Sequence, residues 1–255
     1  MGTAGRWFDL TGRVALVTGG SKGLGRTIAG ALAKAGANLA ITSRTPADLE
    51  RTAEEIRTLG RDVLTVPADV TDEAGISRMV DQVVAHFGHI DILVNNAGIE
   101  GTGAIVEMGA SHWDAVMNVN LRGPMLCCKH VGPHMIQRGR GKVINVASVF
   151  ASRVARYMAA YAATKAGLVQ LTKTLALEWM RANVQVNALC PGYFLTPMNA
   201  AFFSTDQGRR LIERLPSQRL GRPEELEGAV VFLASDATSY MTGATLYVDG
   251  GHQLA

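Results

Sequence analysis

Short apolar runs alternate with longer helical patterns along almost the whole of this 255-residue chain. Each run holds a few β-branched or aliphatic residues and is followed by a segment with helical periodicity. Strands this short and evenly apolar are buried on both faces, as parallel strands covered by helices must be. The alternation therefore predicts βαβ units with right-handed crossovers, which build an α/β fold with a doubly wound parallel sheet of about seven strands. The predicted strands begin at Val14, Leu39, Val63, Ile92, Val143, Val184 and Leu246.

The predicted helices lie near residues 24–35, 46–59, 73–87, 112–137 and 161–180. Only residues 192–223 escape the alternation for long, and this segment carries the apolar side chains Phe194, Met198, Phe202 and Phe203. Loops after the strands build the ligand site in a doubly wound sheet. We therefore expect residues 192–223 to form a substrate-binding lid, with an ordinary pair of surface helices as the alternative. No linker interrupts the pattern, so residues 1–255 are expected to form a single domain.

Composition excludes several classes of protein. The net charge of +3 arises from 25 basic and 22 acidic side chains spread along the chain, so nucleic acid is not an expected partner. No apolar run approaches the roughly 18 residues that span a bilayer, and the N-terminus lacks the pattern of a secretory signal. The three cysteines, Cys127, Cys128 and Cys190, form no CxxC pair, so we expect buried thiols, no metal site and a cytoplasmic protein.

The first predicted strand leads directly into a glycine-rich loop, Thr18-Gly-Gly-Ser-Lys-Gly-Leu-Gly25, and then into a helix. Glycines let backbone N–H groups approach a phosphate without obstruction by a Cβ atom, and the helix N-terminus attracts an anion. The spacing differs from the common GxGxxG fingerprint, so a plain tight turn is the alternative to a nucleotide site. The candidate phosphate-binding residues are Gly19, Ser21, Lys22, Gly23, Leu24 and Gly25.

The end of the second predicted strand indicates which nucleotide the loop would hold. NAD-binding folds usually place a carboxylate there, which accepts a hydrogen bond from the ribose 2′-hydroxyl. This chain has Ser43-Arg44 instead, and a guanidinium can pair with a 2′-phosphate. Lys22 would add a second cation, while Asp48 is expected to cap the next helix. The sequence thus predicts NADP(H) as the preferred cofactor, with NAD(H) possible.

Tyr161 and Lys165 stand four positions apart in a segment that otherwise consists almost entirely of small residues. Four residues return a helix to nearly the same face, so the phenol and the amine can lie side by side. A free phenol has a pKa of about 10, and a nearby ammonium would lower it toward the range that acid–base catalysis requires. The alternative is a tyrosine packed in the core beside a solvated lysine.

These motifs, together with Asn95-Asn-Ala-Gly98 and Ser148, make the sequence resemble the short-chain dehydrogenase/reductase family over nearly its whole length. The likeness runs from Leu10-Thr-Gly-Arg-Val14 to Val248-Asp-Gly-Gly251, and it implies a Rossmann-like fold. Within the family, the sequence is similar to the branch of gluconate 5-dehydrogenases and to that of 3-oxoacyl-thioester reductases. Ala147 and Phe194 depart from the residues that are commoner in the family.

The resemblance implies roles for individual residues. Tyr161 would be the acid/base, Ser148 would stabilise the charge on the substrate oxygen, and Asn120 would hold a water that connects Lys165 to solvent. Tyr161 and Lys165 would also contact the cofactor. The further cofactor-binding residues that the resemblance implies are Asp69, Val70, Asn96, Ala97, Gly98, Pro191, Gly192 and Thr196.

The expected function is an NADP(H)-dependent oxidoreductase that interconverts a secondary alcohol and a ketone. A catalytically idle NADP(H)-binding sensor is the alternative from another class. Arg153 and Arg156 could meet an anionic substrate such as a sugar acid, or could be solvated loop charges. The resemblance also implies a homotetramer that pairs the helices near 112–137 and 161–180, although their apolar stretches at 125–128 and 168–171 could equally face the protein's own sheet.

Overall fold

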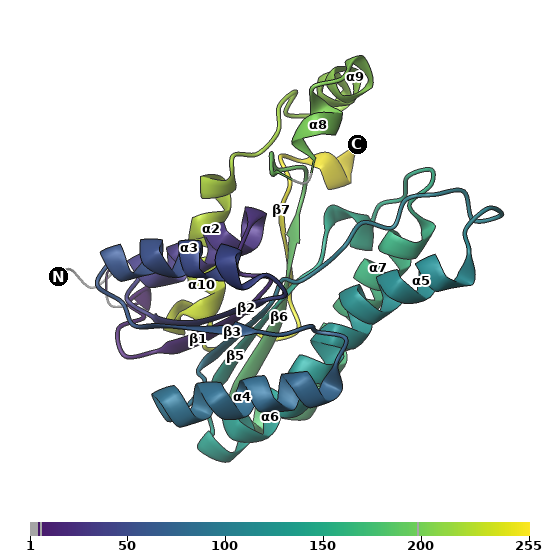
Figure 1. Ribbon diagram of the computed structural model, residues 1–255. Coiled ribbons are helices and arrows are strands. Elements are labelled where there is room, and N and C mark those ends of the chain that lie inside the picture. The colour runs from purple at the N-terminus through teal and green to yellow at the C-terminus, as the bar shows by residue number, and fades with distance from the viewer. Residues whose placement is uncertain (1–4, 6, 198) are drawn as a thin grey trace.

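The structure is a computed structural model that describes residues 5, 7–197 and 199–255. Met198, which the sequence places in the expected lid, lies outside the described residues. A central sheet is covered by helices on both faces, and two projections rise beyond one end of the strands (Figure 1).

Seven strands form one sheet, in which all neighbouring pairs are parallel and the spatial order is β3-β2-β1-β4-β5-β6-β7. The prediction of a doubly wound parallel sheet of about seven strands is confirmed. The order reverses between β1 and β4, so the loops after these two strands diverge and leave a crevice there. The strands are β1 Val14–Thr18, β2 Asn38–Ser43, β3 Val63–Pro67, β4 Ile92–Asn95, β5 Gly141–Val146, β6 Val184–Pro191 and β7 Thr245–Val248.

Two hydrophobic clusters lie on opposite faces of the sheet. On one face, helices α2 Gly23–Lys34, α3 Pro46–Thr58 and α10 Glu227–Ala234 bury aliphatic side chains such as Ile28, Leu49 and Leu233. On the other face, α4 Glu73–Phe87, α6 Gly123–Arg138 and α7 Ala159–Trp179 do the same, and the two sets of helices flank the strands in Figure 1. Burial on both faces explains why the strands lack alternation.

The remaining helices are short. They are α5 Ala110–Met117, α8 Ala200–Phe203 and α9 Asp206–Arg214, the π-helix η1 Asn118–Arg122, and the 3₁₀ turns η2 Val149–Ala151, η3 Met180–Ala182, η4 Pro223–Leu226, η5 Asp236–Thr238 and η6 His252–Leu254. Among the described residues, no helix is long and apolar enough to cross a membrane.

The prediction of a single long α-helix near residues 112–137 is wrong in one respect, because a π-helix interrupts it. The chain forms α5, then the π-helix η1, then α6. Pro124 lies in the first turn of α6, where its missing N–H costs little. Just before it, the Gly123 N–H reaches back to the Asn118 carbonyl, so the backbone widens by one residue at Asn120. The periodicity of apolar residues does not reveal such a local insertion.

All three cysteines are buried, as predicted. Cys127 and Cys128 lie in the core under α6, and Cys190 lies at the end of β6. Burial raises the pKa of the Cys128 thiol to about 12 and that of Cys190 to about 11. The thiols are therefore protonated at neutral pH and pack as small apolar groups.

Candidate active site

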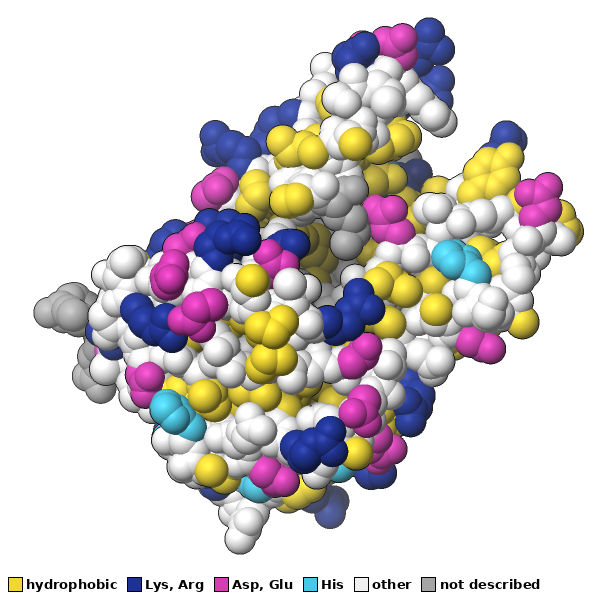
Figure 2. Space-filling view, in the orientation of Figure 1, with side chains coloured by type: hydrophobic (Ala, Val, Ile, Leu, Met, Phe, Trp, Pro, Cys, Tyr) yellow, Lys and Arg dark blue, Asp and Glu magenta, His cyan; other side chains and the backbone are white. Residues whose placement is uncertain are grey.

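A cavity of about 640 Å³ opens at the carboxyl ends of the strands. The glycine loop, the segment after β4, the end of β5, the start of α7 and the segment after β6 all contribute to it. Figure 2 shows the molecular surface hollowed between the projection that carries α8 and α9 and the projection that carries α5 and the start of α7. The sequence-predicted residues that line this cavity are Gly19, Lys22, Gly23, Leu24, Gly25, Asn96, Ala97, Gly98, Ser148, Tyr161, Lys165, Pro191, Gly192 and Thr196.

A second cavity, of about 320 Å³, adjoins the first. Both are lined by Gly19, Lys22 and the segment 97–99, so they form one groove that crosses the crevice of the sheet. The remaining predicted cofactor residues line this second part, namely Ser21, Ser43, Arg44, Asp69 and Val70. Of all the predicted site residues, Asn120 alone lines neither part.

The glycine loop is a cradle that side chains would fill. A Cβ atom on Gly25 would lie 2.0 Å from the Gly19 carbonyl oxygen, and one on Gly19 would lie 2.9 Å from the Cα atom of Ala97. Gly19 and Gly23 also have positive φ angles of 66° and 52°. Helix α2 starts behind the loop with no acidic residue in its first turn and no side-chain cap. Its free N–H groups therefore fit an anion, as the diphosphate of a dinucleotide requires.

Two exposed cations, Lys22 and Arg44, line the second part of the groove. Partial burial acts to raise the pKa of the Asp69 carboxyl, but the net effect is a lowered pKa. The Thr71 N–H and hydroxyl both donate to the Asp69 carboxylate at 2.8 Å, and Arg44 lies nearby. The sequence expectation for Lys22 and Asp48 needs a correction. Asp48 caps nothing with its side chain but pairs with Lys22 at 2.6 Å, so Lys22 is not a free second cation.

Tyr161 and Lys165 lie one turn apart on α7, and the amine is 5.5 Å from the centre of the phenol ring. The Lys165 Nζ donates to the Val146 carbonyl oxygen at 2.9 Å, which directs it toward the end of β5. Ser148 follows that strand, and its hydroxyl oxygen accepts from the Phe150 N–H at 3.2 Å. The structure thus brings phenol, amine and hydroxyl to one side of the same cavity.

The charge state of this pair differs from the sequence expectation. Burial raises the pKa of Tyr161 to about 12, although the hydrogen bond with Ser148 acts in the opposite direction. Burial also lowers the pKa of Lys165 to about 8. The sequence pointed to attraction between ammonium and phenolate, but removal of both groups from water has the larger effect.

Asn120 is fully buried and holds the segment after β4. Its Oδ1 accepts from the Ile99 N–H at 2.8 Å, and its Nδ2 donates to the Ile99 carbonyl oxygen at 2.9 Å. A Cβ atom on Gly98 would lie 3.3 Å from this Oδ1 and 3.7 Å from the Lys165 Nζ. The Asn120 side chain therefore positions backbone that lies beside Lys165.

An aromatic cluster around the cavity was not predicted. The Tyr193 ring stacks on His252 with ring centres 5.4 Å apart, and Phe150 contacts both rings edge-on. Phe203 of α8 packs on Tyr193 at 5.5 Å. Tyr193 directly follows Pro191-Gly192, so its place in the chain was a usable signal. His252 joins the site from the far end of the chain, which no local pattern reveals.

The two arginines proposed to meet an anionic substrate are separated. Arg153 donates to the His252 carbonyl oxygen. Partial burial lowers the pKa of His252, and the nearby Arg153 guanidinium lowers it further. Arg156 is exposed and lines another groove. Neither residue lines the catalytic cavity, whereas Glu100 does.

The crevice of the parallel sheet and the glycine loop before α2 are features of a nucleotide-binding α/β fold. A family model described as enoyl-(acyl carrier protein) reductase matches residues 19–253. The chain belongs to the short-chain dehydrogenase/reductase family.

Its relatives differ in the substrates that their names give. The chain is 40% identical over 247 residues to a 2-dehydro-3-deoxy-D-gluconate 5-dehydrogenase of Escherichia coli, with 96% of each chain covered. It is 38% identical over 238 residues to a 3-oxoacyl-[acyl-carrier-protein] reductase of Staphylococcus epidermidis, covering 93% of this chain and 97% of that one. A solved gluconate 5-dehydrogenase of Burkholderia cenocepacia, in complex with NADP and tartrate, superposes with a TM-score of 0.95 at 40% identity over 99% of both chains.

Proposed function

We propose that this protein is an NADP(H)-dependent oxidoreductase that interconverts a secondary alcohol and a ketone, with Tyr161 as the acid/base. The observation that carries the proposal is the meeting of Tyr161, Lys165 and Ser148 at one cavity, which continues into the glycine cradle. The NADP-bound dehydrogenase from Burkholderia cenocepacia supports the choice of cofactor. In that role the chain is an enzyme that acts on CH–OH groups.

The groove fits the cofactor residue by residue. Gly19, Gly23 and the N-terminus of α2 would hold the diphosphate. Arg44 would meet the 2′-phosphate, and Asp69 and Val70 would border the adenine. Because Lys22 is paired with Asp48, Arg44 carries most of the preference for NADP(H) over NAD(H). The segment 96–98 with Pro191, Gly192 and Thr196 would hold the nicotinamide end, next to Tyr161.

When bound, NADP(H) supplies or accepts the hydride. Tyr161 donates a proton to the carbonyl oxygen during reduction and accepts it during oxidation. The Ser148 oxygen accepts from the Phe150 N–H, and its hydroxyl lies within hydrogen-bonding reach of Tyr161. With substrate bound, the Ser148 O–H would donate to the substrate oxygen and stabilise the charge that develops there. Lys165 donates one N–H to the Val146 carbonyl oxygen, and its other two N–H groups would be available to the cofactor ribose and to a proton relay. Asn120 supports that relay by fixing the backbone beside Lys165.

We further propose that residues 1–255 act as a single cytoplasmic domain and assemble as a homotetramer. Residues 192–223 would serve as the lid. In support of the lid, Phe194 of this segment is buried and lines the cavity, and Phe203 of α8 packs on Tyr193 at the cavity wall. The substrate is a small carbonyl compound, and both gluconate-type acids and 3-oxoacyl thioesters belong in the first screen because relatives carry both names.

The test is NADPH oxidation by the purified protein with a panel of ketones, beside the variant Tyr161→Phe. Loss of a general acid costs about 100-fold to 10,000-fold in rate, and we expect kcat to fall within that range. Equal turnover by the variant would rule out Tyr161 as the acid. If the wild type binds NADPH but turns over no ketone or alcohol, the protein is instead the idle NADP(H)-binding sensor.

A further inference from the structure

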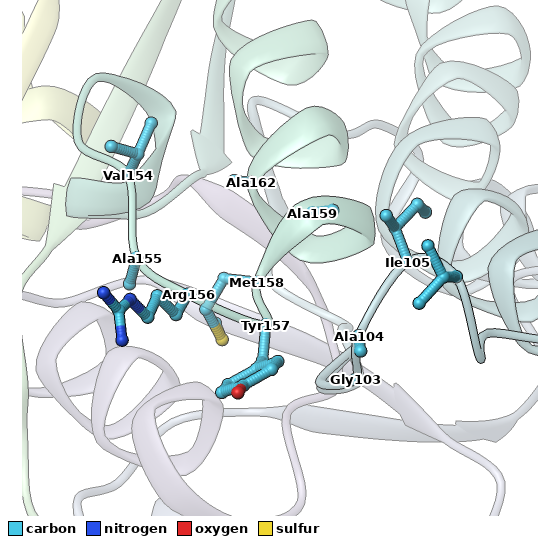
Figure 3. Close-up of a pocket in the computed structure, with 11 residues that line it drawn as sticks. Gly103, Ala104, Ile105, Val154, Ala155, Arg156, Tyr157, Met158, Ala159 and Ala162 are labelled. Carbon is cyan, nitrogen blue, oxygen red and sulfur yellow. The ribbon is translucent and has the colours of Figure 1, made fainter.

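A second groove lies next to the catalytic cavity, between the loop after β4 and the loop that precedes α7. It has a volume of about 490 Å³ (Figure 3). Gly103, Ile105 and their neighbours form one wall, and residues 154–158 form the other, with the first turn of α7 at the base. Met158 lines both this groove and the catalytic cavity, so the two spaces adjoin one another at that side chain.

The groove is apolar and open to solvent. Val106 is 90% exposed, Val154 86% and Ile105 58%, although apolar side chains of this size usually find cover. The backbone holds the two walls together, because the Gly103 N–H donates to the Tyr157 carbonyl oxygen at 2.8 Å. Tyr157 has a φ of +66°, a conformation that a bulky residue rarely adopts. Strain of this kind tends to persist at binding sites.

The neighbouring part of the catalytic cavity has the same character. Val149, Phe150 and Phe194 line it, together with the charged residues Lys22, Lys165 and Glu100. The side chains of Val149, Phe150 and Phe194 offer no hydrogen-bond partner to a hydroxylated chain that lies against them. A chain of methylene groups or an aryl ring would instead gain from burial against them.

We propose that this groove, lined by residues 103–106 and 154–159, binds an apolar tail on the substrate. The inference rests on the proposed function and specifies its substrate class, a ketone or secondary alcohol with an alkyl or aryl chain. The reacting carbon lies at Tyr161, and the chain passes Met158 into the groove. Arg156 lines the groove but not the catalytic cavity, so an anionic group would be favoured at the far end of such a chain and not next to the reacting carbon.

The experiment compares butan-2-one, hexan-2-one and octan-2-one as substrates of the full-length protein with NADPH. Burial of each added methylene should raise kcat/KM by about fourfold. In Val154→Asp and Val106→Asp, a charge lines the groove, and the ratio of kcat/KM for octan-2-one to that for butan-2-one should fall at least tenfold. Both side chains are exposed, so the variants are expected to fold. Leu59→Asp, at the end of α3, introduces the same charge outside the groove and should keep the wild-type ratio.

The outcomes separate this inference from the proposed function. Turnover of all three ketones without dependence on chain length would overturn the tail groove and leave the oxidoreductase intact. If no ketone is turned over, the proposed function fails. Calorimetry with octan-2-one then tests the tail site separately, because Val154→Asp should bind octan-2-one more weakly than the wild type does. Val154→Asp could also change the molar mass in light scattering while the ratio of kcat/KM for octan-2-one to butan-2-one stays the same. That result would show that a second copy of the chain covers the groove, and it would overturn the proposed tail site.

Discussion

Lys165 is a buried charge whose burial opposes folding. The group is ionised in the unfolded chain up to about pH 10.5, but in the folded protein only up to a pKa of about 8. Below pH 8 the folded protein bears the full cost of the buried ammonium, about 3 kcal/mol. Between pH 8 and pH 10.5 the unfolded chain binds more protons, so stability rises with pH across that window and the cost is gone above it.

Lys165→Met should therefore lose activity and gain stability. At pH 7 we expect urea unfolding to give a free energy about 1–2 kcal/mol above the wild type, because relief of the buried charge exceeds the loss of the hydrogen bond to Val146. The gain should vanish near pH 10.5, while turnover falls at least 100-fold.

Lys142 supplies the matched control for Lys165→Met. Burial lowers its pKa to about 8 as well, and its Nζ donates to the Thr238 hydroxyl at 3.1 Å, away from the cavity. Lys142→Met should show a similar pH-dependent gain with full activity. A destabilised Lys165→Met at pH 7 would contradict the assignment of that residue as a buried functional charge.

Arg44 is the residue that should set cofactor choice. In Arg44→Ser we expect the KM for NADPH to rise at least tenfold, since a charged hydrogen-bonded pair contributes about 1.5–3 kcal/mol, whereas the KM for NADH should change little. Steady-state kinetics with both cofactors measures the effect. Arg51→Ser is the control, because Arg51 pairs with Asp48 at 3.2 Å but does not line the groove. Parallel losses with both cofactors would show that Arg44 does not meet the 2′-phosphate.

Residue chemistry could be predicted from sequence where it depends on local spacing, and not where it depends on distant partners. The step from Tyr161 to Lys165 follows from helix geometry alone. The pairing of Lys22 with Asp48 depends on how α3 packs beside the loop, and His252 reaches Tyr193 only after the whole sheet has formed. The raised pKa of Tyr161 likewise depends on burial, which the sequence does not measure.

At the scale of elements, the glycine loop and α2 act together. Gly25→Ala places a methyl group 2.0 Å from the Gly19 carbonyl oxygen, so the loop must move and NADPH affinity should fall at least tenfold in a fluorescence titration. Gly30→Ala changes the same helix at a position with no neighbour within 4 Å. That variant should bind NADPH normally and gain about 0.5–1 kcal/mol, as alanine favours helix over glycine. Equal affinity in both variants would mean that the cradle does not hold the nucleotide.

Element boundaries were predictable where one physical signal dominates. The strands and α4 follow from continuous apolar runs and from a clear helical period. The π-helix at 118–122 does not, because it adds one residue to a turn and leaves the apolar pattern on either side intact. The segment 192–223 was recognisable as irregular, but its two short helices, α8 and α9, depend on tertiary contacts such as that of Phe203 with Tyr193.

At the scale of the whole molecule, the outer faces of α6 and α7 are the surfaces through which copies of the chain would contact one another in the proposed homotetramer. Cys127, Cys128 and Leu168 face the protein's own core, which decides the alternative that the sequence left open for those positions. Met125 and Leu177 instead point outward, with exposed fractions of 38% and 73%. A groove of about 370 Å³ between α6 and α7 is lined by Leu121, Met125, Gly167 and Leu171 among others.

A homotetramer that pairs these helices would bury the exposed side chains that the monomer leaves in water. Leu177→Arg places a charge in that interface, and a buried unpaired charge is costly enough to break a contact between two copies. We expect light scattering to give a molar mass at least twofold below that of the wild type. Leu59→Arg, on the outer end of α3, adds the same charge away from α6 and α7 and should leave the mass unchanged. An unaltered mass for Leu177→Arg would exclude α7 as the assembly surface and would direct attention to the fully exposed Tyr240 beside β7.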